Sequence, residues 1–148
     1  MNRRQEQALR ALWNADDLEW KVFADAPAEV KRDIEQTVLD QLEAEGKHIH
    51  PGAGNLFGAE RARRELQLFA GWVYQQLSES KQVVQTVCRD VKYCERRQAK
   101  TFESEGVTVS IAVADALVSS AIGVPIPIIQ LTVYIIKRGI LDQICECS

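Results

Sequence analysis

The sequence predicts an all-α helical bundle, and three observations support this prediction. The chain of 148 residues is 46% hydrophobic and 26% charged, the balance of a globular protein with a packed core. Apolar residues recur every three or four positions over most of the first 100 residues, which is the helical period. The last third is strongly apolar and is divided by a Gly/Pro-rich turn, which predicts a hairpin of two helices. At this length we expect a single helical domain over residues 1–148.

Residues 1–46 are expected to form an N-terminal helical pair. The first helix carries apolar residues at helical spacing and is expected to break near Asn14. Pro27 suits the first turn of the second helix, and Gly46 suits its end. The apolar residues of this second helix repeat every four positions: Val30, Ile34, Val38 and Leu42.

Residues 58–100 predict one long heptad-patterned helix or a broken helix pair. The segment contains no proline, and its apolar residues advance by alternating steps of three and four. The polar run Ser78-Glu79-Ser80 is the expected place for a break. The seam either packs inside the bundle or binds another chain. We select six seam residues as candidate interaction contacts: Leu66, Val73, Leu77, Val84, Val87 and Val91.

Residues 107–145 predict a C-terminal apolar helical hairpin. Gly123 and the prolines after it divide the apolar run 107–136 into two arms, each shorter than the ~20 residues that an α-helix needs to cross a bilayer. A stripe of small residues favours helices, whereas alternation of apolar and polar residues leaves an α+β fold with a C-terminal β-hairpin as the alternative. Asp115 is the only formal charge between Glu105 and Lys137. We expect it to be buried and paired, and the alternative is a switch charge that lets the hairpin enter a membrane.

Basic residues flank this hairpin on both sides. Arg96, Arg97 and Lys100 precede it, and Lys137 and Arg138 follow it. A solvated face is the ordinary interpretation, and contact with lipid headgroups or another anionic surface is the alternative. The net charge of −3 gives the whole chain no general attraction for nucleic acid, so a nucleic-acid partner is not expected.

The cysteines and histidines offer the ligand types of a zinc site but not the usual spacing. The candidates are His48 and His50 in the loop after the second helix, with Cys145 and Cys147 near the C-terminus. A charged N-terminus without a secretory pattern predicts a cytoplasmic protein, with membrane association as the alternative. The four cysteines are therefore expected to be free thiols, and no metal or cofactor is expected.

The sequence shows no nucleophile beside a base and no phosphate-binding glycine loop, so we do not expect an enzyme. The leading hypothesis is a non-enzymatic protein–protein interaction or assembly module. Its binding surface would be the heptad seam or the apolar hairpin, and its partner another protein or a second copy of the chain. The rival hypothesis is a small membrane-active protein with an insertable hairpin at residues 107–136.

Overall fold

The computed structural model describes residues 2–47, 57–98, 102–120 and 123–147, and all regular structure in these ranges is helical. The predicted all-α class is confirmed. The alternative β-hairpin is wrong, because the described part of 107–136 forms helices α7 and α8. In chain order the elements are α1 (Arg3–Trp13), α2 (Leu18–Ala24), α3 (Ala28–Ala44), α4 (Gly58–Ser78), α5 (Lys81–Val83), the π-helix η1 (Val84–Asp90), α6 (Tyr93–Gln98), α7 (Phe102–Ser119), α8 (Ile128–Lys137) and α9 (Ile140–Ile144).

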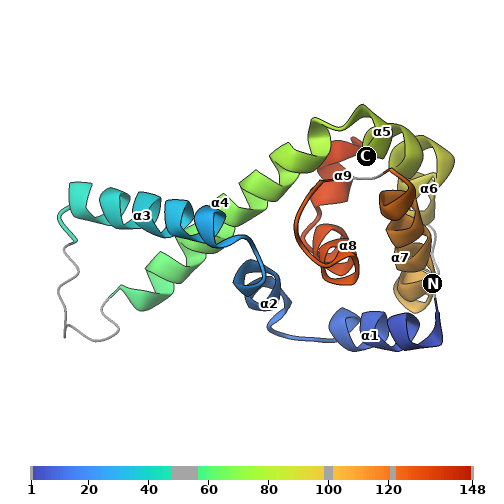
Figure 1. Ribbon diagram of the computed structural model, residues 1–148, viewed down its shortest axis with the longest axis horizontal. Coiled ribbons are helices and arrows are strands. Elements are labelled where there is room, and N and C mark those ends of the chain that lie inside the picture. Colours follow the sequence, from blue (N-terminus) through green and yellow to red (C-terminus); the bar gives the residue numbers. More distant parts are fainter. Residues whose placement is uncertain (1, 48–56, 99–101, 121–122, 148) are drawn as a thin grey trace.

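Helix α8 is the centre of the fold. It contacts α1, α2, α7 and α9, and Figure 1 shows these helices arranged around it. Every residue from Leu131 to Ile136 is buried, with an exposed fraction of 3% or less. A helix that is apolar on all sides must be covered on all sides. Thr132 fits this setting because its hydroxyl donates to the carbonyl of Ile128 at 2.7 Å.

Helix α7 is held close to α1 by a glycine. A Cβ atom on Gly106 would lie 2.4 Å from Cζ2 of Trp13, so no other residue fits without displacing the indole. Buried Ser110 donates to the carbonyl of Gly106 at 2.7 Å, and Ser120 donates to that of Ala116 at 2.8 Å. These bonds satisfy the polar groups that α7 places in the core.

Helix α3 and the first half of α4 form an arm that projects from the rest of the molecule (Figure 1). Here "the arm" means residues 28–47 and 57–66. Val38 and Leu42 on α3 are fully buried, and α3 contacts α4. Gly46 ends α3 as predicted: it takes a φ of 80°, and the N–H of Lys47 donates to the carbonyl of Leu42 at 2.8 Å. This is the hydrogen bond of a Schellman cap.

Residues 58–98 form several helices rather than a single long one. The predicted break occurs: α4 ends at Ser78, and the hydroxyl of Ser80 accepts a bond from the N–H of Val83 at the start of α5. A second break, which the heptad pattern did not predict, lies between η1 and α6, where Lys92 takes a positive φ of 59°. This second break reorients the chain before the apolar hairpin.

Candidate functional site

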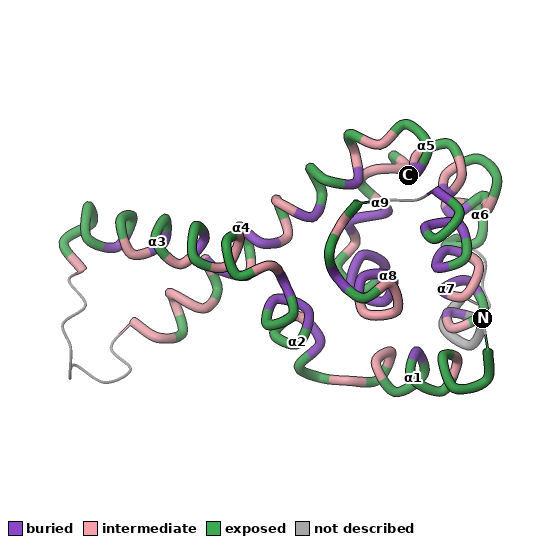
Figure 2. Tube along the Cα trace, in the orientation of Figure 1, coloured by how far each residue is buried: buried purple, intermediate pink, exposed green. Residues whose placement is uncertain are grey.

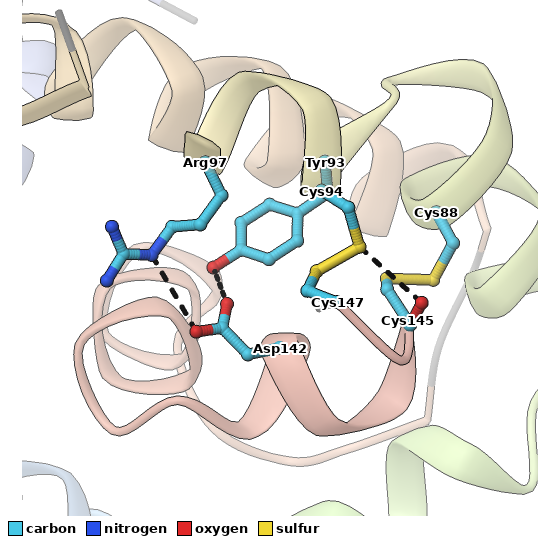
Figure 3. Close-up of a disulfide and its surroundings, with 7 residues drawn as sticks. All are labelled: Cys88, Tyr93, Cys94, Arg97, Asp142, Cys145 and Cys147. Carbon is cyan, nitrogen blue, oxygen red and sulfur yellow. Dashed lines mark hydrogen bonds and ion pairs between the residues drawn. A yellow bond between two sulfur atoms is a disulfide. The ribbon is translucent and has the colours of Figure 1, made fainter. Parts of the chain in front are cut away.

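Two disulfides join the C-terminal end of the chain to η1 and α6 (Figure 3). Cys88 bonds to Cys145, and Cys94 bonds to Cys147, each with a Cα–Cα distance of 5.2 Å. The expectation of four free thiols is therefore wrong. It followed from a predicted reducing compartment, and the two-residue spacing of Cys145 and Cys147 was the overlooked signal of neighbouring bridges.

Local backbone turns bring the four sulfurs together. On an unbroken helix Cys88 and Cys94 would point about 120° apart. The break at Lys92 lets both face the C-terminal segment. On the other side, Glu146 takes a φ of 54°, and the N–H of Cys147 donates to the carbonyl of Asp142 at 2.9 Å. This Schellman cap closes α9 and holds Cys145 and Cys147 against η1 and α6.

A buried phenol supports the disulfide cluster from α6. The hydroxyl of Tyr93, whose side chain is fully buried, donates to Oδ1 of Asp142 at 2.8 Å (Figure 3). Arg97 lies beside the same carboxylate, with 3.7 Å between its Nε and Oδ2. Burial, together with the hydrogen bond to Asp142, raises the pKa of Tyr93 well above its usual range. The phenol therefore remains a hydrogen-bond donor at all physiological pH values.

The cluster leaves no ligand set for zinc at this end of the chain. Cys145 and Cys147 form disulfides and have no thiolate to bind a metal, so their selection as candidate metal ligands is wrong. His48 and His50 lie outside the described residues. Among the described residues no group of three or more His, Cys, Asp or Glu side chains is placed to hold a metal ion.

The heptad seam packs inside the chain rather than on its surface. Val73, Leu77 and Val87 are fully buried in the core, while Leu66, Val84 and Val91 are partly buried. Leu66 and Val91 pack against that core. The structure therefore uses most of the proposed interaction residues for intramolecular packing, which was the other interpretation of the seam.

Most of the described basic residues near the hairpin contact groups within the protein. Nε of Arg138 lies 3.2 Å from Oε1 of Glu19, and Nζ of Lys137 lies 4.4 Å from the centroid of a Trp13 ring. Arg96 is exposed on α6, and Lys100 lies outside the described residues. Of the flanking cations that the structure describes, Arg97, Lys137 and Arg138 thus have contacts within the chain.

Asp115 is exposed on α7, so the expectation that it is buried is wrong. The apolar run 107–136 has no stripe of polar residues, so the sequence did not show which side of this helix faces solvent. Val118, one turn further along α7, is also on the outside with 62% of its surface exposed.

An ion-pair network fixes the far end of the arm. Nζ of Lys47 lies 2.7 Å from Oε1 of Glu60, and Arg64 donates to Glu45 and Glu60, both at 2.8 Å. The hydrogen bond and charge of Arg64 lower the pKa of Glu45 to about 2. These contacts tie the end of α3 to the beginning of α4, so the two arm helices are joined through side chains as well as through their apolar contact.

The described surface includes the following open hollows. One of about 470 Å³ runs along α3 and is lined by Glu29, Arg32, Asp33, Glu35, Gln36 and Leu39. One of about 260 Å³ lies beside α5 and η1 and is lined by Ser78, Lys81, Val84, Gln85 and Arg89. A third, also of about 260 Å³, lies between α2 and the end of α8 and includes Trp20 and Tyr134. We regard all three as candidate surfaces for contact.

The fold and these surfaces define a class of protein: an all-α body closed by two neighbouring disulfides, with a projecting two-helix arm. Comparisons of the chain with protein-family models, curated proteins and solved structures found no match. In the part of the chain that the structure describes, no helix has the length and apolar character needed to cross a membrane.

Proposed function

We propose that the protein is a non-enzymatic protein-binding module that presents its arm to a protein partner. The projection of the arm from the disulfide-closed body supports this proposal most directly (Figure 2). The arm buries its own apolar residues Val38 and Leu42, and its ion pairs join its two helices. A surface that is already ordered binds with a smaller entropic cost than a flexible one.

Site-specific photocrosslinking in the source cells would test this proposal. A photoreactive residue replaces Gln36 on the arm, and a matched variant carries it at Gln7 on α1; both glutamines are exposed on helices. We expect a discrete crosslinked protein from position 36 and none from position 7. The absence of an adduct at position 36, or the same adducts at both positions, would refute the role of the arm.

The disulfides bear on where the protein works. Disulfides persist in oxidising compartments and are reduced in most cytosols. We therefore favour an oxidising location over the cytoplasmic one. When cells are quenched with acid and their proteins are then denatured and treated with a maleimide-polyethylene glycol, the chain should remain unmodified, whereas four labelled cysteines would return the protein to a reducing compartment.

The rival role, membrane insertion of the hairpin at residues 107–136, has less support. Helix α8 fills the core, so insertion would remove the helix around which α1, α2, α7 and α9 pack. The disulfides also tie the segment after α8 to η1 and α6. Flotation of the protein with anionic liposomes would reinstate the rival role, and we expect the protein to stay out of the lipid fraction.

A further inference from the structure

Two ends of the molecule carry opposite charge. Helix α3 contains five acidic and two basic residues, a net charge of −3. The segment 81–98, which comprises α5, η1 and α6, contains five basic and two acidic residues, a net charge of +3, and all seven charged side chains are exposed. Although the net charge of the whole chain is small, its charges are distributed as a dipole.

These two charged surfaces cannot meet within one copy of the chain. Along the longest axis of the molecule, α3 lies at one end and α6 at the other (Figure 1). α3 contacts α4, whereas α6 contacts α7 and η1. A contact between these two surfaces therefore requires a second molecule.

Each surface also has a hollow with an apolar residue in its lining. The hollow on α3 combines Leu39 with the carboxylates of Glu29 and Asp33. The hollow beside η1 combines Val84 with the cations Lys81 and Arg89. Opposite charges around small apolar contacts are the complementarity that directs association between proteins.

We propose that the arm of one copy docks through the acidic face of α3 on the basic face that segment 81–98, comprising α5, η1 and α6, presents on a second copy. This inference rests on the proposed binding role of the arm and names a second copy of the chain as its partner. The two surfaces are different, so each contact joins an acidic face to a basic face. Two copies can make both contacts at once as an antiparallel pair, and more copies can join head-to-tail into a ring or a filament.

Charge reversal tests the docking. The arm variant carries Asp33→Lys and Asp40→Lys, and the body variant carries Lys81→Glu and Arg89→Glu; all four positions are exposed. By light scattering coupled to size-exclusion chromatography at about 50 mM salt, we expect the wild type to form oligomers. Each variant alone should be a monomer. Salt at about 500 mM should weaken wild-type association by roughly tenfold or more, because it screens exposed charges.

Mixing the two variants gives the sharpest result. The unaltered acidic arm of the body variant can dock on the unaltered basic face of the arm variant. The reversed arm of the arm variant can dock on the reversed face of the body variant. The mixture should therefore recover oligomers in which the two variants alternate, although each variant alone is a monomer. A chain with all four substitutions has the wild-type net charge and exchanges the two faces, so it should recover the oligomers. A control with Arg4→Glu and Arg10→Glu on α1 should assemble like the wild type.

The outcomes separate this inference from the proposed function. A wild type that stays monomeric at low salt and high concentration refutes the second copy as partner, while an arm-specific photoadduct with another protein would still support the binding role. Binding of the polyanion heparin to a monomeric wild type, lost in the body variant, would assign the basic face to a different ligand. Oligomers that persist in both variants would place the self-association elsewhere.

Discussion

The two disulfides span overlapping loops of similar size, and this overlap predicts a non-additive loss of stability when they are removed. Cys88 and Cys145 are 57 residues apart in the sequence, and Cys94 and Cys147 are 53 apart. In the chain-entropy treatment, either bond alone restrains the unfolded chain by about 4 kcal/mol. Once one bond exists, the other closes only the small ring formed by residues 88–94 and 145–147. Closing that ring contributes about 2.5 kcal/mol.

Replacement of either cysteine pair by alanine should therefore lower the free energy of unfolding by about 2.5 kcal/mol. Replacement of both pairs should lower it by about 6.5 kcal/mol, more than the sum of the two single losses. The physical reason is that each bond, while the other is present, restrains only a short loop. The first bond removed therefore reports a small constraint, and the second reports a large one.

Urea titrations of the four proteins, without reductant, measure these values by linear extrapolation. A loss of about 6.5 kcal/mol approaches the whole stability of a typical domain, so all titrations include the same concentration of sucrose, which stabilises folded states. Single losses of about 4 kcal/mol that add to the double loss would refute the reasoning that the second bond closes only a small ring. A loss near zero for one pair, with about 4 kcal/mol for the other, would show that the first bridge is absent in solution.

Three further predictions concern packing, pH and the arm. Gly106→Ala should destabilise the protein by about 1–3 kcal/mol because the new methyl group meets Trp13. The control Gly71→Ala, where a new Cβ has no atom within 4 Å, should be neutral or stabilising by up to about 1 kcal/mol. Equal urea midpoints for the two variants would contradict this. Because the pKa of Glu45 is lowered to about 2, its ion pairs contribute fully above pH 5 and are lost as the pH falls from 5 to 2. The variant Glu45→Gln should show a shallower decline of thermal stability over that interval. Parallel curves of melting temperature against pH would argue against the pairing. Leu42→Ala should cost about 2–5 kcal/mol and abolish the crosslink from the arm, since the residue is fully buried; an unchanged adduct would show that the packing of the arm is not needed for binding.

Local patterns in the sequence determined the class of the fold and several helix ends. Asn14, Gly46 and Ser78–Ser80 interrupt the helical period, and helices end at each of them in the structure. These signals depend on residue chemistry within one or two turns: a hydroxyl that caps a helix, or a glycine that takes a positive φ. The apolar character of 128–136 likewise indicated burial, although it did not show that α8 would be the central helix.

The exposure of the charged residues and the pairing of the cysteines depend on contacts between residues that are far apart in the sequence. The seam predicted apolar packing but could not choose between an inner and an outer partner, and Asp115 could not be assigned to a face from an apolar run that had no polar stripe. The opposite charges of α3 and of segment 81–98 are visible as residue types, but only the projection of the arm places them at opposite ends of the molecule.

What the sequence by itself determined about this protein is that it is helical, where several helices end, and which segments are apolar enough to form its core. The tertiary structure decided which cysteines pair, because a disulfide requires two Cα atoms about 5–6 Å apart and the four cysteines lie more than 50 residues apart across each bond. The reorientation at Lys92 and the turn at Glu146 supply that proximity, and each takes a left-handed conformation in a residue other than glycine. Residue type gives little warning of such turns, because packing around them rather than intrinsic preference holds the backbone there.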